Sequence, residues 1–369
     1  MVVLHVMEAL GGGTARHLVD VVRFAHGVDH LVAVPRRRVG AFSDDAAAEQ
    51  LRAAGADVRF VEMRPRPPHP RNVSALASLA RLVGSVRPDV VHGHSSVGGA
   101  LGRVAAMRHR PRLVYTANAL SPSRAALAVE RALGRLTDRF IAVSVSEGEE
   151  VVRLGVVPRE RLVVIPNGID PEETPVAPFS LRTRLGLDAG TPLVGTVSRL
   201  VPQKAPEIFV AACAVVAVAD PTARFVLIGS GPLRPGVEAA IDKGGLRGRL
   251  RVVDDVSDAA GLVGELDVFV STARFEGGPY SPLDAMREAT PVVLTAATGN
   301  VDVVIDGESG YLAPVDDAGA VAAHVLRLLA EPRLRRRVGA AGRARLVREF
   351  DVRDMGRSLS RLYTDLSPR

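Results

Sequence analysis

Short apolar runs alternate with segments of helical periodicity along the first half of the chain. The apolar runs are VVLHVM at 2–7, HLVAVP at 30–35, DVRFVEM at 57–63 and RLVYTA at 112–117. Among the helical segments, the one that starts near Asn72 carries Leu76, Leu79, Val83 and Val86 on one face. This alternation predicts an α/β domain in which a parallel sheet is covered by helices.

The alternation stops after Asp170 and restarts near residue 190. The intervening segment, PEETPVAPFSLRTRLGLDAGTP, is rich in proline. We therefore expect a first Rossmann-like domain at 1–168, a linker at 169–189 and a second Rossmann-like domain at 190–350. Residues 351–369 are expected to form a helix that packs back on the first domain, with Phe350, Met355, Leu359 and Leu362 as its buried stripe.

Composition is that of a globular protein large enough for two cores. The chain has 369 residues, of which 47% are hydrophobic, and no apolar run approaches the roughly 20 residues of a membrane span. We therefore expect a cytoplasmic protein. Cys213 lies in the apolar segment VAACAVV and is expected to be a buried thiol.

The net charge of +6 comes almost entirely from arginine, because Lys204 and Lys243 are the only lysines. Basic residues gather in the first half, at Arg36, Arg37 and Arg38 and in RPRPPHPR at 64–71. They are consistent with contact to anionic lipid headgroups or a phosphorylated acceptor, and equally with compositional bias. Aromatic residues make up only 4% of the chain, which argues against nucleic acid as a partner.

Three segments carry candidate chemistry at strand ends, where parallel sheets bind ligands. Gly11, Gly12 and Gly13 form a glycine-rich turn before a helix, which suits either a phosphate or a tight packing turn. Arg199 and Lys204 follow the strand PLVGTVS. These two cations suit a pyrophosphate, although solvated loop charges are the alternative.

The third segment is STARFEGGPYSPLDAM, in which Glu276 lies in a loop and Asp284 lies on the helix that follows. A carboxylate in each place can accept hydroxyls of a sugar and of a ribose, and the amides between them can face a phosphate. The alternative is a helix stabilised by acidic residues near its N-terminus.

In their order and spacing, these motifs resemble the retaining glycosyltransferases of family 4, or group 1. The resemblance covers nearly the whole chain. It rests on GGGTARH, PDVVHGHSSVGGALGR, VIPNGID, FVLIGSGP, the Arg199 and Lys204 pair, and EGGPYSPLDAM followed by DGESGYL. It implies the GT-B fold, in which two Rossmann-like domains with parallel sheets face a central cleft and a C-terminal helix crosses back.

The resemblance also implies roles for individual residues. Arg199 and Lys204 would clamp the donor diphosphate, Glu276 would hold the donor sugar, and Asp284 would bind the ribose. The other donor-binding candidates are Gly12, Gly13, Gly277, Gly278, Pro279, Tyr280 and Ser281.

The chain departs from the family pattern at two positions. Asp284 stands where a glutamate is usual, so its ribose contact is expected to be longer or water-mediated. Asn118, in YTANAL, stands where a histidine near the reacting sugar is common. The asparagine side chain does not act as an acid or base at neutral pH. Asn118 is therefore expected to act by hydrogen bonding to a sugar hydroxyl or to backbone.

Other polar residues are assigned with alternatives left open. His92, His94 and Ser95, in VHGHSS, are acceptor-binding candidates, and structural hydrogen bonding is the alternative for the histidines. The pairs Asp254–Asp255 and Asp316–Asp317 lack an Asp-x-Asp context and are expected to be solvated or helix-capping. The sequence therefore predicts no metal site and no cofactor.

The predicted function is retaining transfer of a hexose or N-acetylhexosamine from a nucleotide diphosphate sugar, with UDP expected first and GDP next. The acceptor is expected to be a glycan, a polyprenyl-linked saccharide or a natural product, with peripheral contact to the inner face of the membrane. A sugar-nucleotide epimerase and a catalytically silent nucleotide-sugar-binding subunit are the alternatives. A nicotinamide-dependent dehydrogenase does not fit, because GGGTARH is not a GxGxxG motif.

Overall fold

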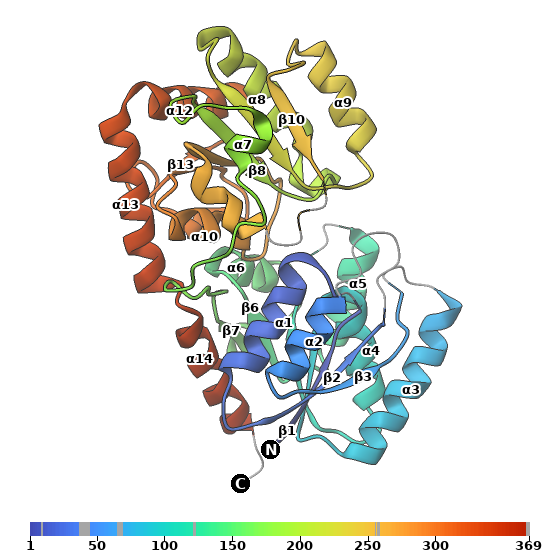
Figure 1. Ribbon diagram of the computed structural model, residues 1–369. Helices are drawn as coiled ribbons and strands as arrows, with labels where there is room; N and C mark the ends of the chain where they lie inside the picture. Colours follow the sequence, from blue (N-terminus) through green and yellow to red (C-terminus); the bar gives the residue numbers. More distant parts are fainter. Residues whose placement is uncertain are drawn as a thin grey trace. The chain divides into compact units, whose positions relative to one another are not determined.

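The computed structural model describes residues 1–8, 10–36, 45–64, 69–120, 123–254, 256 and 259–366. The chain divides into two compact units, Ile169–Asp351 and the combination of Met1–Gly168 with Val352–Arg369 (Figure 1). Each unit is built on a parallel sheet, so the predicted α/β class is confirmed.

The first unit contains a seven-stranded sheet in the order β3-β2-β1-β4-β5-β6-β7. Its strands are β1 Val2–Val6, β2 Asp29–Val34, β3 Asp57–Phe60, β4 Val90–His94, β5 Arg112–Thr116, β6 Arg139–Ala142 and β7 Leu162–Val164. Its helices are α1 Gly12–Phe24, α2 Asp45–Ala53, α3 Pro70–Val86, α4 Ser96–Ala106, α5 Arg124–Gly134, α6 Val145–Arg153, the short η1 Arg159–Arg161 and α14 Val352–Leu366. The strand order reverses between β1 and β4, the place where sheets of this kind bind ligands.

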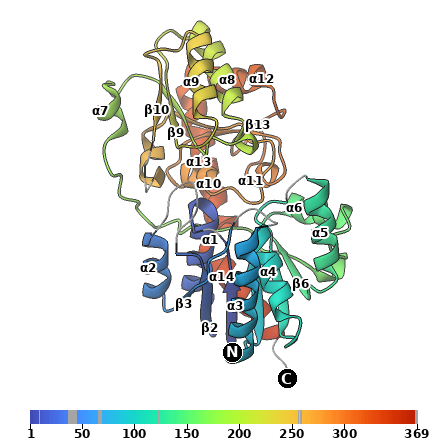
Figure 2. The ribbon, with the colours of Figure 1, turned by 90° about the vertical axis from the view of Figure 1, so that its right-hand side faces the viewer.

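Neighbouring residues on β1 show why both faces of this sheet are covered. Val3 packs in a cluster with Val21 of α1 and Leu359 of α14, whereas Leu4 packs with Leu79 of α3. Successive strand residues point to opposite faces, so each face needs its own apolar layer. The views in Figures 1 and 2 show α14 beside α1 and show α3 and α4 covering the other side.

The C-terminal helix belongs to the first unit, but its expected stripe divides between the two units. Met355, Leu359 and Leu362 pack in the first unit. Phe350 lies before α14 and packs in the second unit's core, where Ile169 pairs with Asp351 in a β-bridge. The chain therefore passes from one unit to the other between Asp351 and Val352.

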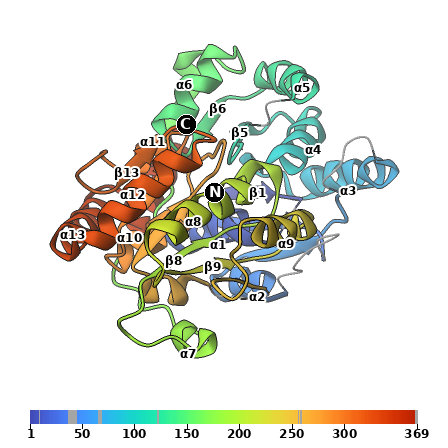
Figure 3. The same cartoon turned by 90° about the horizontal axis from the view of Figure 1, so that it is seen from above.

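The second unit contains a six-stranded sheet in the order β10-β9-β8-β11-β12-β13. Its strands are β8 Leu193–Val197, β9 Arg224–Ile228, β10 Leu250–Val253, β11 Val268–Ser271, β12 Val292–Thr295 and β13 Tyr311–Ala313. Its helices are α7 Leu181–Leu185, η2 Pro202–Lys204, α8 Pro206–Ala219, α9 Arg234–Lys243, η3 Ala259–Glu265, α10 Tyr280–Arg287, α11 Asn300–Val303, α12 Ala318–Ala330 and α13 Pro332–Glu349. In Figure 3, α8 and α12 lie side by side over one face of the sheet.

Three sequence expectations in this unit can be compared with the structure. Residues 169–189, expected as a linker, belong to the second unit and include α7, whose Leu181 is fully buried in that unit's core. Cys213 is a buried thiol, as predicted, and burial raises its pKa well above the ordinary value. The expectation that no apolar run approaches the length of a membrane span is wrong for Pro202–Ala219, which is apolar and long enough to cross one. Within this segment, α8 buries Phe209, Cys213 and Val216 in the core.

Candidate functional site

Two loops of the second unit carry the residues that the sequence assigns to the diphosphate and the sugar. One loop follows β8 and the other follows β11, and these strands are parallel neighbours. Gly229 and Gly231, beyond β9, let the first loop pack closely. A Cβ at Gly229 would lie 2.1 Å from the Ser198 carbonyl oxygen, and one at Gly231 would lie 2.5 Å from that of Leu200. The GSG part of FVLIGSGP therefore holds the backbone on either side of Arg199.

Lys204 and Glu276 form an ion pair that joins these loops. The Lys204 ammonium contacts Glu276 Oε1, and the two side chains are 20% and 7% exposed. Gln203 Nε2 donates to the Phe275 carbonyl at 2.9 Å and to Glu276 Oε2 at 3.4 Å. Arg199 Nη2 donates to Gln203 Oε1 at 3.4 Å. The structure thus brings Arg199, Lys204 and Glu276 together, with Gln203 as the bridge.

The backbone around Glu276 is fixed by a second turn of the chain. Glu276 N donates to the Thr298 carbonyl at 2.9 Å. Gly299 has φ +82°, and a Cβ there would lie 2.5 Å from the Gly277 carbonyl oxygen. Only glycine adopts this conformation at so close an approach without strain. Gly299 therefore helps hold the Glu276 carboxylate toward Lys204.

Asp284 lies inside α10 rather than on an open surface. The helix begins at Tyr280 after Pro279, with Ser281 half-buried in its first turn. Asp284 is 6% exposed, and its Oδ1 lies 3.3 Å from Arg287 Nη2. Arg287 is itself 1% exposed. The carboxylate is therefore part of a buried ion pair, and its contact with a ribose stays a prediction.

The glycine turn of the first unit leaves its backbone open. Helix α1 begins at Gly12, and both Gly12 and Gly13 are exposed. Gly12 has φ +62°, and a Cβ there would meet nothing within 4 Å. The positive φ favours glycine here, and backbone amides at a helix start suit an anion. Phosphate binding at this turn stays a prediction.

Asn118 lies in a turn that a distant carboxylate holds in place. Asn118 and Ala119 have φ values of +57° and +107°. Glu147, 1% exposed, accepts from the amides of Ala119 and Val143, each at 2.8 Å. Asn118 Nδ2 is buried and has no hydrogen-bond partner among the residues that the structure describes. An unsatisfied buried amide donor is consistent with the predicted role of Asn118 as a hydrogen-bonding group.

The paired aspartates take surface and capping positions. Asp254 pairs with Arg234 at 2.5 Å, and Asp316 pairs with Arg274 at 2.8 Å. Asp317 caps α12 by accepting from the Ala320 amide at 2.8 Å, as expected of a helix cap. Asp255 lies outside the described residues.

Comparison with known proteins identifies the family. The model described as Glycosyl transferases group 1 matches residues 180–345, and that described as Glycosyltransferase Family 4 matches residues 11–173. The D-inositol 3-phosphate glycosyltransferase of Frankia alni is 31% identical over 69% of this chain and 70% of its own. This chain belongs to the group 1 glycosyltransferases. The predicted membership of this family is confirmed, and the retaining mechanism stays a prediction.

Two further relatives of this glycosyltransferase bear on its fold and function. An Escherichia coli protein named UDP-Gal:alpha-D-GlcNAc-diphosphoundecaprenol alpha-1,3-galactosyltransferase is 28% identical, over 67% of this chain and 68% of its own. The crystal structure of Anabaena Alr3699/HepE in complex with UDP and glucose matches with a TM-score of 0.85 and 21% identity. That match covers 99% of this chain and 100% of the other. These similarities support the predicted GT-B fold and do not favour an epimerase or a silent subunit.

The acceptor-binding candidates of this glycosyltransferase are engaged inside the first unit. His92 is fully buried, with Tyr363 OH 2.7 Å from Nδ1 and Thr116 Oγ1 2.8 Å from Nε2. Ser95 Oγ donates at 2.9 Å to Glu8, which also accepts from the Gly98 amide at 2.9 Å. For His92, the structure thus shows the structural alternative, with both ring nitrogens already in hydrogen bonds.

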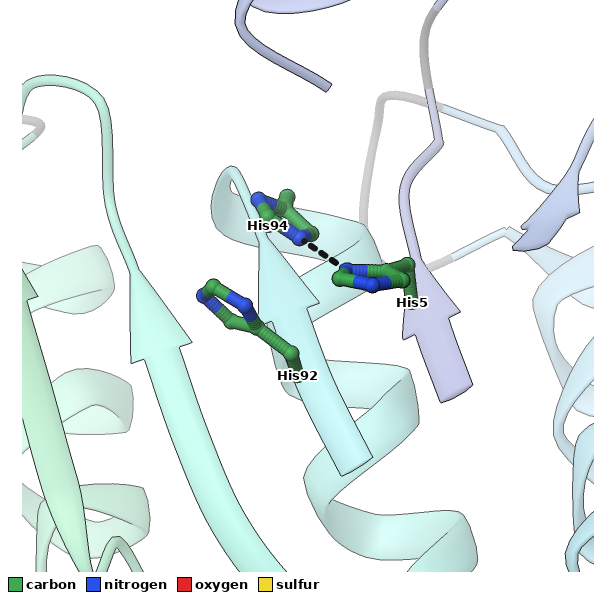
Figure 4. A group of neighbouring side chains, drawn as sticks. All are labelled: His5, His92 and His94. Atoms are coloured by element: carbon green, nitrogen blue, oxygen red, sulfur yellow. Dashed lines mark hydrogen bonds between the residues drawn. The ribbon is translucent and has the colours of Figure 1, made fainter. Parts of the chain in front are cut away.

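His94 is also fully buried and ends a directed chain of imidazoles. His30 Nε2 lies 2.8 Å from the Ala25 carbonyl, which only accepts, so Nε2 carries the proton. Neutral His30 then accepts from His5 Nε2 at 3.0 Å, and neutral His5 accepts from His94 Nε2 at 3.0 Å (Figure 4). His94 Nδ1 therefore carries no proton, and its lone pair has no hydrogen-bond partner among the described residues.

Ring nitrogens of His5, His92 and His94 lie within 4.8 Å of one another, a spacing at which three histidines can share a metal ion. In the part of the chain that the structure describes, hydrogen bonds already occupy these nitrogens apart from His94 Nδ1. Burial, and then the neighbouring imidazoles, lower the pKa of all three rings well below the ordinary value. The hydrogen bonds therefore account for the cluster as a network of neutral side chains.

Sequence reasoning missed Glu8, His5, Glu147 and Gln203. Glu147 carried a visible signal, because Ser144 and Glu147 form the Ser-x-x-Glu pattern of a helix start, and Ser144 Oγ accepts from the Glu147 amide at 3.2 Å. The other three residues match no local pattern. His5 and Glu8 have partners distant in sequence, and Gln203 joins its near neighbour Arg199 to the distant Phe275 and Glu276. The distant groups become neighbours through the order of the strands.

Proposed function

We propose that this protein is a retaining, metal-independent transferase that moves a hexose or N-acetylhexosamine from a UDP sugar to a glycan, polyprenyl-linked or natural-product acceptor. The observation that carries the proposal is the contact of Lys204 with Glu276, beside Arg199. A fixed cation for a phosphate and a carboxylate for a sugar are adjacent here, as a bound sugar diphosphate requires.

Arg199 and Lys204 meet the charge that forms when the donor breaks. The acceptor hydroxyl oxygen bonds to the anomeric carbon, and the bond from that carbon to the phosphate oxygen breaks. The phosphate oxygen gains negative charge and takes the hydroxyl proton. Fixed cations aimed at that oxygen stabilise the transition state. Attack on the face that the diphosphate leaves retains the anomeric configuration. Glu276 accepts hydroxyls of the sugar, while Asn118 contributes hydrogen bonding only.

The choice of UDP and of a lipid-linked acceptor is supported by relatives. The Alr3699/HepE structure is a complex with UDP and glucose. The Escherichia coli relative is named for transfer from UDP-Gal to a diphosphoundecaprenol saccharide. GDP is the second base that we propose to test.

The function is tested by incubating the protein with UDP- and GDP-linked hexoses and N-acetylhexosamines, together with polyprenyl-diphosphate and soluble acceptors. We expect a UDP sugar to be the donor that is turned over and to raise the melting temperature, because ligand bound to the native state stabilises it. Activity should persist in excess EDTA, and NMR should show a product with the donor's anomeric configuration. An inverted product, or loss of activity in EDTA that added metal restores, would contradict the mechanism.

We further propose that the protein contacts the inner face of the membrane, because a lipid-linked acceptor is held in the membrane. Arg36 lies over the Phe60 ring, with its guanidinium 4.6 Å from the centroid. Arg37, Arg38 and residues 65–68 lie outside the described residues. We expect the protein to float with anionic liposomes at low salt and to be released as salt rises. Recovery entirely in the soluble fraction at low salt would favour a soluble acceptor.

A further inference from the structure

We propose that Glu276 makes the donor site discriminate a UDP sugar from UDP by holding or releasing Lys204. The inference rests on the proposed function and adds a role for Glu276 beyond contact with the sugar. Lys204 cannot give its full charge to a phosphate while its ammonium is paired with the Glu276 carboxylate. Whatever occupies the carboxylate therefore decides how strongly Lys204 binds phosphate.

The surroundings of the pair restrict the change to the Lys204 side chain. Thr272 Oγ1 donates to the carbonyls of Lys204 and Ala205, at 3.1 and 3.0 Å, and so fixes the backbone. The backbone of Glu276 is fixed by Thr298, and Oε2 is within hydrogen-bonding distance of Gln203. Both partners are mostly buried, so solvent screens their attraction less than that of a surface pair. The pair is therefore a real competitor of a phosphate for the ammonium.

Donor and product differ in what they offer Glu276. The hydroxyls of a UDP sugar donate hydrogen bonds to the carboxylate, weaken its attraction for the ammonium and leave Lys204 for the phosphate. UDP alone offers no sugar hydroxyl at that position, so its terminal phosphate competes with Glu276 for Lys204. After transfer the sugar leaves with the acceptor, and Glu276 recovers Lys204. UDP is then bound weakly, which favours its release after the reaction.

The experiment measures UDP affinity by calorimetry in the wild type, Glu276→Gln, Lys204→Ala and the double variant. Glu276→Gln should bind UDP roughly tenfold more tightly, because Lys204 is then free to make a charge-assisted contact with the phosphate. Its turnover of the UDP sugar should fall. Lys204→Ala should change UDP affinity little, because Glu276 already holds that lysine. In the double variant the tenfold gain should disappear.

Glu331→Gln is the matched control. Glu331 pairs with Arg327 in the same unit at 3.6 Å, and both side chains are more than half exposed. This variant should bind UDP as the wild type does. Glu276→Asp provides a second variant of the site, should Glu276→Gln fold poorly by thermal melting. It shortens the side chain by one methylene, and we expect an intermediate gain.

Three results would overturn the inference. Equal UDP affinity in the wild type and both Glu276 variants would show that the pair does not compete with phosphate. A gain that persists without Lys204 would show simple repulsion between Glu276 and the diphosphate. In both cases the proposed function would stand. A folded wild type that binds neither UDP nor GDP would instead contradict the proposed function, and the inference with it.

Discussion

Lys204→Ala and Arg199→Ala should each lower kcat by roughly ten- to a thousandfold, with a smaller change in donor affinity. The departing diphosphate gains charge in the transition state, so a cation beside it contributes more there than in the bound donor. Lys204 gives up its contact with Glu276 when the donor binds, and this exchange limits its net contribution to donor affinity. Steady-state kinetics with the donor that is turned over, combined with calorimetric binding, would separate the two effects.

Lys243→Ala and Arg333→Ala are the matched controls. Lys243 is the only other lysine of the chain, and both control residues are exposed in the second unit. We expect wild-type kcat and donor affinity from both. If the Lys204 and Arg199 variants lost donor affinity as much as they lost kcat, the cations would hold the ground state and the proposed transition-state role would be wrong.

Acidification should destabilise the first unit selectively between pH 6.5 and pH 4. Burial lowers the pKa of His17 from 6.5 to about 4, whereas its hydrogen bond to Asn167 raises it. In this range the unfolded chain binds more protons than the native one, so stability is complete above pH 6.5 and falls as the pH decreases toward 4. That shift corresponds to about 3 kcal/mol for His17 alone. His5, His92 and His94 act in the same direction.

Hydrogen exchange of the full chain, corrected for intrinsic exchange rates, can follow each unit separately. Between pH 7.5 and pH 5, peptides from β1 and β4 should lose about 2 kcal/mol or more of protection, the share of His17 in that interval. Peptides from β8 and β11 are the internal reference, because eight of the nine histidines belong to the first unit and only His324 to the second.

Two variants connect this acid sensitivity to particular residues. His17→Gln removes a buried titrating ring and should make the loss on acidification smaller, whereas exposed His109→Gln should leave it unchanged. Equal loss of protection in both units, or an unchanged loss in His17→Gln, would show that the buried imidazoles do not cause the acid sensitivity.

The α/β class, the order of the elements and the loops that follow β8 and β11 could be predicted from the sequence. The spacing of apolar residues indicates which residues are buried, and glycine or proline indicates where a strand or helix ends. Both signals are local in the sequence. Arg199, Lys204 and Glu276 were chosen as candidates because they follow such strands. The same reasoning predicted that some residues are buried but not in which unit they are buried. Phe350 is apolar and buried as expected, yet it packs in the second unit, and the expected linker contributes Leu181 to that unit's core.

The tertiary structure alone decided which polar groups are partners. Lys204 and Glu276 are 72 positions apart, His5 and His94 are 89 apart, and His92 and Tyr363 are 271 apart. Each pair depends on strand order or on the return of α14, and no pattern within a window of sequence contains that information. Periodicity records that a side chain leaves water, whereas a hydrogen bond or an ion pair requires two specific atoms about 3 Å apart. The sequence by itself therefore determined the class of fold and the chemistry of the loops. Folding decided that Lys204 and Glu276 form an ion pair with each other, and that the histidines of VHGHSS belong to the core.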